Sequence, residues 1–361
     1  MKLIAIADVH VSAKLPYAPR GYDRIEAETL PALYRVIRYA SKNKIKHILM
    51  LGDFFDSISI SPSEFRVLKL FVAAAAKHGI QLISIAGNHE IDESSTAIAH
   101  NMAGLDCKKR SFSLKIDGIT ICAIDFCRSL SEFKLPLTQL IKKTSPPRIL
   151  IAHQAVEGAW FNKIKSINGI PKDWFSNKGI IGKNFAYCLF GDFHRSQPLP
   201  FNSGIYVGNL TQNDFKDEGN QPQFIVLDCK TMKTKAIASK APTFNTMSIT
   251  KDSIEFEKPR GKCYIRIKAS GPKAFIRSLN IEAIRTELKE QYDAITIMIE
   301  PPTITDKHTS RTKAKTGIRK ETSDEELVTT IIKKDQPPLI PTKILYDYGI
   351  KHLKAAREQQ Q

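Results

Sequence analysis

Short apolar runs that end in polar residues recur along the first two thirds of the chain. The strand-like runs KLIAIAD, KHILMLGD and QLISIAGN alternate with two segments, around 27–40 and 64–77, whose apolar residues recur at helical spacing. This alternation predicts a βαβ beginning. Further strand-like runs follow at GITICAIDF, RILIAHQ, AYCLFGD, GIYVGN and QFIVLD. We therefore expect an α/β domain over residues 1–240.

The pattern changes near residue 241. KPRGKC predicts a hairpin turn, the charged segment 281–291 predicts a helix, and AITIMIE predicts a strand, so residues 241–304 should form a small α+β domain. Residues 305–322 have the composition of a flexible linker. Residues 323–356 contain two short amphipathic segments separated by DQPPLIP, whose apolar residues are too few for a core of their own. We expect this tail to dock on another surface.

The linker is strongly basic. Its central part contains no acidic and no aromatic residue, and its basic residues are Lys307, Arg311, Lys313, Lys315, Arg319 and Lys320. Two interpretations remain open, a solvated tether and a tether that contacts DNA. The whole chain has a formal net charge of +17 and a pI near 9.5, which favours an anionic partner, nucleic acid first.

The composition indicates a soluble protein of a reducing compartment. The longest apolar run covers 70–76, far short of the roughly 20 residues that span a membrane. Asp8 and His10 interrupt the apolar N-terminal run, which we expect to be the first strand rather than a signal peptide. The six cysteines form no CxxC pair, which favours buried free thiols over disulfides or a zinc site. We expect a cytoplasmic protein without membrane association.

Five of the strand-like runs end in Asp, Asn or His, in the segments IADVH, LGDFFDS, AGNHE, IAHQ and FGDFH. In an α/β sheet the carboxyl ends of the strands meet in one crevice, where ligands bind. We therefore expect eight side chains to converge there: Asp8, His10, Asp53, Asn88, His89, His153, Asp192 and His194. Oxygen ligands mixed with imidazole nitrogens suit Mn²⁺, Fe or Zn rather than Ca²⁺ alone.

The set is too large for one ion. It fits a metal pair roughly 3.5–4 Å apart that is bridged by Asp53, with Gly52 leaving room for the backbone to approach. Each motif alone also has a structural interpretation, because GNH and GDxxD occur in turns where Asn or Asp caps a helix. The order DxH, GDxxD, GNHE, H, GDxH at successive strand ends is what indicates a metal centre. The histidines that fit no strand end should be surface or packing residues: His47, His78, His100, His308 and His352.

With these motifs, the sequence from Met1 to about Asp228 resembles the calcineurin-like metallophosphoesterases. The segment SGIYVGNLTQNDFKDE after GDFH, the appended α+β domain and the helical tail are similar to SbcD-type nuclease subunits, relatives of the meiotic-recombination nuclease and of bacteriophage recombination endonuclease subunits. The resemblance implies a β-sandwich flanked by helices and a DNA-recognising capping domain at 241–304. It also implies two divalent cations as cofactors, Mn²⁺ first with Mg²⁺ as the alternative.

The resemblance further implies individual roles. One metal would be held by Asp8, His10, Asp53 and His194, and the other by Asp53, Asn88, His153 and Asp192. His89 would assist the leaving oxygen as an acid or electrostatic partner, and Asp56 would orient His89. Many relatives have histidine at the position of Asp192, and some have it at that of Asp56. A carboxylate can replace imidazole as a metal ligand, so Asp192 in place of histidine affects which metal is preferred rather than whether a metal binds.

Three functions are compatible with these observations. The first is a Mn²⁺-dependent DNA nuclease, exonuclease on double strands and endonuclease on single strands, acting with an SbcC-like ABC ATPase in DNA end processing, recombination and repair. By resemblance, 323–356 would bind the base of the ATPase coiled coil, and two copies of the chain would pair as a homodimer within a heterotetramer. The protein would then be nucleoid-associated, in the host cytoplasm if viral. The alternatives are a stand-alone phosphodiesterase or phosphatase with a smaller substrate, and a DNA-end-binding scaffold with a vestigial metal site.

Overall fold

The computed structural model describes residues 1–12, 18–91, 111–156, 159, 178–201 and 203–305. The chain divides into two compact units, Met1–Asp306 and Lys307–Gln361. The second unit lies outside the described residues, and with it almost all of the predicted basic linker and the whole predicted helical tail.

The first sheet has the strand order β11-β10-β1-β2-β3. Its strands are β1 (Lys2–Ile6), β2 (His47–Leu51), β3 (Gln81–Ile85), β10 (Gln223–Asp228) and β11 (Lys233–Ala238). The first three are parallel, whereas β10 runs antiparallel to β1 and β11 antiparallel to β10. Side chains alternate along β1, with Ile4 and Ile6 in the core on one face and Leu3 and Ala5 in the core on the other. Apolar residues on both faces explain why the strands are continuous apolar runs.

The second sheet has the order β4-β5-β6-β7-β9-β8. Its strands are β4 (Ser111–Ile116), β5 (Ile119–Ile124), β6 (Arg148–His153), β7 (Tyr187–Gly191), β8 (Gln197–Pro198) and β9 (Gly204–Tyr206). Strands β5, β6, β7 and β9 are parallel, and the outer strands β4 and β8 are antiparallel to their neighbours. Apolar residues of both sheets, among them Leu49, Ile121 and Leu189, form one shared buried cluster. The two sheets therefore make a sandwich.

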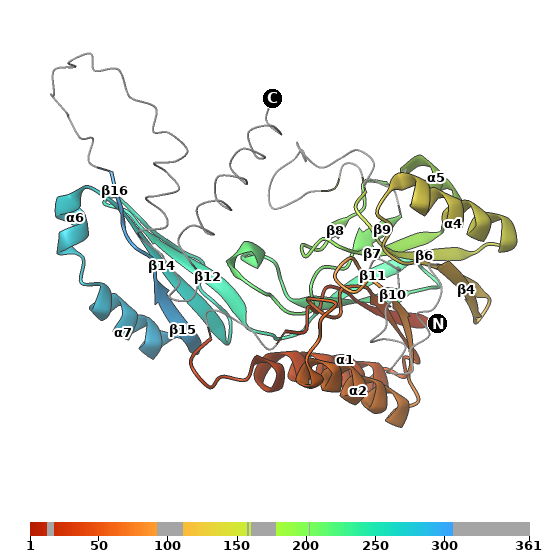
Figure 1. The fold of residues 1–361 in the computed structure, drawn as a ribbon, viewed down its shortest axis with the longest axis horizontal. Helices are drawn as coiled ribbons and strands as arrows, with labels where there is room; N and C mark the ends of the chain where they lie inside the picture. Colours follow the sequence, from red (N-terminus) through yellow and green to blue (C-terminus); the bar gives the residue numbers. More distant parts are fainter. Residues whose placement is uncertain (13–17, 92–110, 157–158, 160–177, 202, 306–361) are drawn as a thin grey trace, which may run out of the picture. The chain divides into compact units, whose positions relative to one another are not determined.

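Helices cover the outer faces of the sandwich (Figure 1). Among the described residues, the helices before β7 are α1 (Leu30–Lys42), which follows the π-helical turn η1 (Ile25–Thr29), α2 (Pro62–Lys77), α4 (Leu130–Lys143) and α5 (Lys178–Asn184). Helix α2 begins with a capping box in which Ser61 and Glu64 bond to each other's backbone N–H groups. The α/β sandwich flanked by helices was predicted, and it is confirmed.

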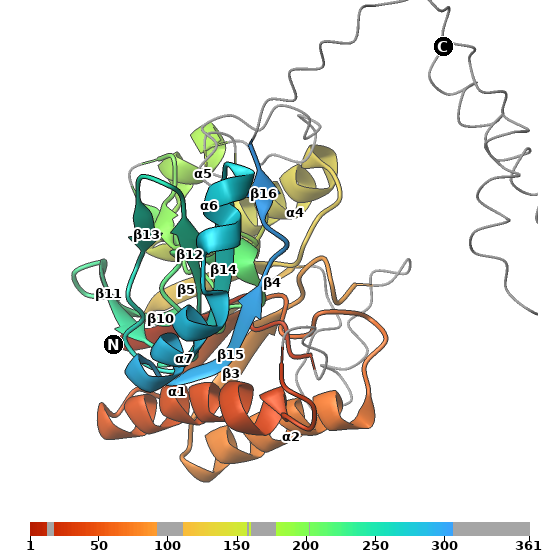
Figure 2. The same ribbon diagram turned by 90° about the vertical axis from the view of Figure 1, so that its left-hand side faces the viewer.

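We refer to residues 243–304 as the cap. Its strands are β12 (Thr243–Ile249), β13 (Ile254–Phe256), β14 (Cys263–Gly271), β15 (Ala294–Ile299) and β16 (Thr303–Ile304), with helices α6 (Lys273–Ser278) and α7 (Ile281–Gln291) (Figures 1 and 2). The order is β13-β12-β14-β15, and β16 also pairs with β14. On β14, Ile265 and Ile267 join the cluster that contains α7, whereas Tyr264 belongs to a cluster with Phe215 and Phe244.

The hairpin predicted at KPRGKC is wrong. The stretch connects β13 to β14, but these strands lie on opposite sides of β12 and do not pair. The hairpin of the cap is β12–β13, closed by the Thr250 N–H bond to the Ser253 carbonyl. Strand β14 instead pairs in parallel with β12. A Pro-Gly stretch signals a reversal of direction, but it does not specify which strand becomes the neighbour.

Two composition-based expectations can be checked. Every described cysteine is free and buried, as predicted: Cys122, Cys127, Cys188, Cys229 and Cys263. Among the described residues, none of the helices has both the length and the apolar character that crossing a membrane requires.

Candidate metal centre

The eight side chains predicted to converge all lie at the carboxyl ends of five strands. Asp8 and His10 follow β1, Asp53 follows β2, Asn88 and His89 follow β3, His153 ends β6, and Asp192 and His194 follow β7. The parallel direction of β1, β2 and β3 in one sheet, and of β6 and β7 in the other, brings these ends to one edge of the sandwich.

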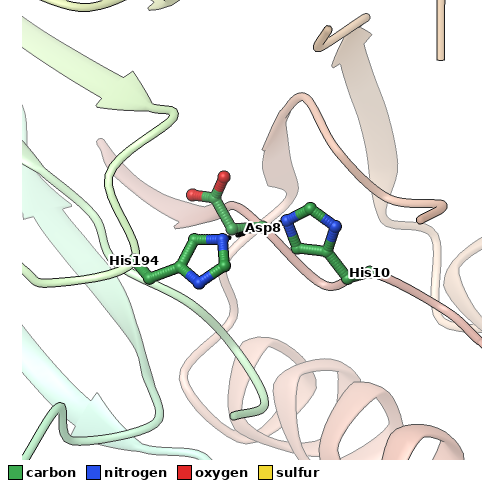
Figure 3. Close-up of side chains that lie close together, drawn as sticks. All are labelled: Asp8, His10 and His194. Carbon is green, nitrogen blue, oxygen red and sulfur yellow. Dashed lines mark hydrogen bonds between the residues drawn. The ribbon is translucent and has the colours of Figure 1, made fainter. Parts of the chain in front are cut away.

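Asp8, His10 and His194 form one group of ligand atoms within 4.8 Å of one another (Figure 3). The Nε2 atoms of the two histidines are 3.1 Å apart. Their Nδ1 atoms bond to carboxylates, His10 to Asp56 at 3.2 Å and His194 to Asp217 at 2.7 Å. With Nδ1 as the donor, each Nε2 presents a lone pair, and adjacent ligands on one cation at about 2.1 Å would have about this separation.

His153 is the centre of a second group. Its Nε2 lies 3.1 Å from Asn88 Oδ1, 3.3 Å from Asp53 Oδ2 and 3.9 Å from Asp192 Oδ1. Its Nδ1 donates to the Leu51 carbonyl at 2.7 Å, which directs Nε2 toward these oxygens. A fully buried imidazole aimed at three oxygen ligands matches the second metal set that the resemblance implied.

Asp53 lies between the two groups. Its Oδ2 is 3.7 Å from His10 Nε2 and 3.3 Å from His153 Nε2, while its Oδ1 accepts from the His89 backbone N–H at 3.0 Å. A Cβ on Gly87 would collide with the Asp53 carboxylate, and one on Gly52 would collide with the His153 ring. From the sequence, Gly52 was expected to let the backbone approach the metals. In the structure it makes room for the His153 imidazole. The position of Asp53 fits a bridging carboxylate.

Two observations show that the residues present fit metal ions. Asp8 is fully buried, one of its oxygens accepts from the Asp192 N–H at 3.2 Å, and the other has no hydrogen-bond partner within the described part of the chain. Such an acceptor is costly unless a ligand satisfies it. In addition, Asp8, His10, Asp53 and Asp192 have left-handed backbone, with φ of 49°, 45°, 49° and 94°. Strain of this kind is typical of functional sites.

In the absence of metal, the charges of the group shift several pKa values. Burial would raise the pKa of Asp53, but His153, His10 and His89 outweigh it and hold the pKa below its usual range. Burial raises the pKa of Asp192 to about 6. Burial would lower the pKa of His194, but its hydrogen bond to Asp217 and the charge of that carboxylate raise the pKa to about 9. A cation bound here must therefore displace protons.

His89 is the most exposed of the four histidines in this site: its side chain is 41% exposed, against 32% for His194 and 4% or less for His10 and His153. Its Nδ1 donates to the backbone carbonyl of Asp56 at 2.8 Å, and its Nε2 lies 3.9 Å from Asp53 Oδ2. Asp56 was predicted to orient His89, and it contacts His89 with this backbone carbonyl. Its carboxylate lies 4.0 Å from His89 Nδ1 and bonds to His10 at 3.2 Å. Asp56 thus orients His89 through its backbone and His10 through its side chain.

Two buried carboxylates beside the site, Glu90 and Asp217, were not predicted from the sequence. Glu90 accepts from the N–H groups of Phe54 (2.9 Å), Phe55 (3.1 Å) and Gly87 (3.0 Å), and so ties the loop after β2 to the loop after β3. Asp217 bonds to His194. Glu90 is part of the GNHE motif, and Asp217 is part of the NDFKDE segment after GDFH. Their positions in these motifs were the sequence feature that could have predicted a role at the site.

A cavity of about 290 Å³ opens beside these groups. His10, His89, Asp192 and His194 form part of its lining, and Arg195 and Lys216 are exposed cations on its wall. The six basic residues predicted to contact DNA, between 307 and 320, lie outside the described residues.

Known proteins are similar to this chain over part of its length. Residues 1–226 match the model of the calcineurin-like phosphoesterase family. The DNA double-strand break repair protein Mre11 of Sulfurisphaera tokodaii is 25% identical over 220 residues, which are 57% of this chain and 52% of that protein. The match therefore spans about half of the relative's length.

Solved structures are similar at lower identity. A dimetal phosphatase from Danio rerio is 10% identical with a TM-score of 0.44, covering 66% of this chain and 96% of that one. An archaeal phosphodiesterase is 13% identical with a TM-score of 0.33, covering 66% of this chain and 99% of that one. At these scores the two structures support no closer relationship.

Proposed function

The chain belongs to the calcineurin-like phosphoesterase family, and from this premise we propose that it is a dimetal DNA nuclease. The observation that carries the proposal is the position of Asp53 between two groups of ligand atoms, 3.7 Å from His10 Nε2 and 3.3 Å from His153 Nε2. Two divalent cations, Mn²⁺ first, would be held by Asp8, His10, Asp53 and His194 and by Asp53, Asn88, His153 and Asp192. When bound, such ions activate water and neutralise charge on a phosphoryl group.

The chain's own residues would complete the reaction. His89 lines the cavity, and the Asp56 carbonyl accepts its Nδ1–H and fixes the ring, which leaves Nε2 for a substrate. An imidazole protonated on both nitrogens can give its Nε2 proton to the leaving oxygen of the cleaved phosphodiester. Arg195 and Lys216 on the cavity wall are suited to contact neighbouring phosphate groups. Hydrolysis would then yield a phosphate monoester and a free hydroxyl.

DNA as the substrate is supported by the partial similarity to Mre11 and by the net charge of +17. A second cavity has a volume of about 1050 Å³, and none of the proposed metal ligands lines it. Its lining includes four basic residues, Lys240, Lys258, Arg260 and Lys262, and one acidic residue, Glu257. A large opening with this charge suits an extended polyanion better than a small ester. We infer that residues 307–320 add further phosphate contacts, that 323–356 bind an SbcC-like ATPase, and that two copies of the chain pair.

One experiment separates this function from its alternatives. The purified protein is incubated with linear duplex, plasmid and single-stranded DNA and with a small aryl phosphodiester, in Mn²⁺, Mg²⁺ or EDTA, with and without the ATPase. We expect Mn²⁺-dependent cutting of DNA that Asp53→Ala abolishes. Hydrolysis of the aryl ester without DNA cutting would favour a small-substrate phosphodiesterase. DNA binding without any hydrolysis would favour the scaffold.

A further inference from the structure

Residues 212–218 lie between a proposed metal ligand and the cap. Two consecutive carboxylates in this turn have different partners. Asp217 accepts from His194 Nδ1 at 2.7 Å, whereas Glu218 accepts from the backbone N–H of Thr246 in β12 and, at 2.6 Å, from the hydroxyl of the same residue. Asp217 thus bonds to a proposed metal ligand, and the next residue, Glu218, bonds to the cap.

Gln212 makes a second connection of the same kind. Its side chain is buried, its Oε1 accepts from the Phe244 N–H of β12 at 2.6 Å, and its Nε2 donates to the Asp217 carbonyl at 2.8 Å. A single amide therefore bonds both to the cap strand and to the residue that orients His194. If β12 shifts, either the Asp217 backbone moves with it or one of these buried hydrogen bonds is lost, which is costly.

Aromatic packing joins the turn to the cap as well. The Phe215 ring lies under the Arg266 guanidinium at 4.2 Å and edge-on to Phe244 at 4.9 Å, and Phe244 stacks on Tyr264 at 4.6 Å. Phe215, at the start of the 3-10 turn η3 (Phe215–Asp217), is 8% exposed. Because Phe215 of the turn packs in one buried cluster with Phe244 and Tyr264 of the cap, the turn and the cap should move as one body.

The rest of the phosphoesterase domain restrains the turn from the other side. Arg24 donates to the Gln212 carbonyl at 2.9 Å and to Asn213 Oδ1 at 2.7 Å, and it forms an ion pair with Glu28 at 3.5 Å. Glu28 accepts from the hydroxyl of Tyr264 in the cap. The docked position of the cap is therefore specified by buried polar contacts on both sides of the turn.

We propose that the 212–218 turn couples the cap to the metal centre. Asp217 is a positioning residue for His194, and Glu218 and Gln212 set the place of Asp217 according to the position of β12. The coupling rests on the proposed function, because it requires a metal ion at His194. The docked cap should strengthen metal binding at His194 by some factor. Because the coupling between the two equilibria is reciprocal, a metal bound there should favour the docked cap by the same factor. A substrate that displaces or secures the cap would thereby alter the metal centre.

Hydrogen exchange measures this coupling directly. The N–H groups of Phe244 and Thr246 have side chains of the turn as acceptors, so a short peptide that covers both reports the contact. We expect Mn²⁺ to slow exchange of this peptide in the wild-type protein by about fivefold or more relative to EDTA. Asp217→Ala should abolish the effect of Mn²⁺. Asp217→Asn, which keeps an acceptor for His194 Nδ1, should restore part of it.

The reciprocal experiment measures Mn²⁺ affinity by calorimetry. Glu218→Ala should weaken one of the two Mn²⁺ sites by roughly twofold to thirtyfold, although Glu218 bonds to no proposed ligand. Glu218 also forms an ion pair with Arg266 at 3.7 Å. The matched control is Glu300→Ala, because Glu300 pairs with the same Arg266 at 3.2 Å but belongs to the cap and not to the turn. The control should leave both sites unchanged.

The outcomes separate the coupling from the function on which it rests. If the wild-type protein binds two Mn²⁺ ions but the peptide exchanges equally fast with and without them, the coupling is wrong and the metal centre stands. The coupling is also wrong if Glu218→Ala and Glu300→Ala change Mn²⁺ affinity equally. A wild-type protein that binds no Mn²⁺ would overturn both the proposed function and the coupling.

Discussion

Replacing Glu90 by glutamine should destabilise the fold and weaken metal binding together. Glu90 is 6% exposed, and its two oxygens accept from Phe54 (2.9 Å), Phe55 (3.1 Å) and Gly87 (3.0 Å). Glutamine has the same size, but its amide group would face one of these N–H donors with a donor. The loop after β2 carries Asp53 and the loop after β3 carries Asn88, so the substitution loosens both at once.

The magnitude follows from the three bonds. A hydrogen bond to a charged acceptor contributes about 1.5–3 kcal/mol, and the amide removes one such bond and the charge from the others, so the free energy of unfolding should fall by about 2–4 kcal/mol. At about 2–4 °C for each kcal/mol, the Tm should fall by about 4–16 °C. Loss of a direct hydrogen-bond partner of a metal ligand typically weakens metal binding by about 10–100-fold. Glu90 bonds to the residues next to Asp53 and Asn88 rather than to the ligands, so Mn²⁺ binding should weaken by about tenfold, the lower end of this range.

The assay is urea unfolding in EDTA, followed by Mn²⁺ titration of the folded variant. The matched control is Glu26→Gln, which removes an ion pair with Arg66 of 2.9 Å whose side chains are 52% and 63% exposed. Such a pair contributes at most about 1 kcal/mol, and Mn²⁺ affinity should not change. If Glu90→Gln unfolds like the control, or loses stability while binding Mn²⁺ with wild-type affinity, Glu90 does not join the two loops as described.

Four further expectations can be tested separately. His89→Ala should lower DNA cleavage by about 10²–10⁴-fold and leave the Mn²⁺ stoichiometry intact, so a variant that lost its metal would contradict the role given to His89. Asp56→Asn should weaken Mn²⁺ binding about tenfold in calorimetry, since the Nδ1 of His10 loses a charged acceptor. The pKa of His194 is raised to about 9, so protons compete with the metal for this imidazole below that pH. Mn²⁺ affinity should therefore rise with pH toward 9, and binding at pH 7 should release protons. Equal heats of binding in buffers of different ionisation enthalpy would show that no proton is released and would contradict this prediction. Truncation at Thr322 should keep Mn²⁺-dependent cleavage but abolish co-purification with the ATPase, and a truncated chain that melts much earlier would show that the tail folds back on its own domain.

The sequence predicted the convergence of the metal ligands because two simple regularities combine there. Apolar runs of strand length identify buried strands, and parallel strands bring their carboxyl ends to one edge. Asp8, Asp53 and His153 could therefore be placed together before any contact was known. The helix at 281–291 was also predicted within its observed bounds, because charged and apolar residues alternate there at helical spacing.

The remaining features depend on contacts that periodicity does not encode. The pairing of β14 with β12 is decided by packing of the whole cap, so the turn-like KPRGKC led to the wrong hairpin. Asp56 bonds to His89 with its own backbone carbonyl, and its carboxylate bonds to His10, a division of roles that the GDxxD motif does not specify. Asp217 lies 23 residues after His194, and no helical or strand period links two residues at that separation.

Anomalous diffraction from crystals grown with Mn²⁺ would locate the pair of metal ions proposed on either side of Asp53. We expect two anomalous peaks about 3.5–4 Å apart, one between His10 and His194 and the other beside His153, with the Asp53 carboxylate touching both. A single peak, or peaks remote from Asp53, would contradict this expectation.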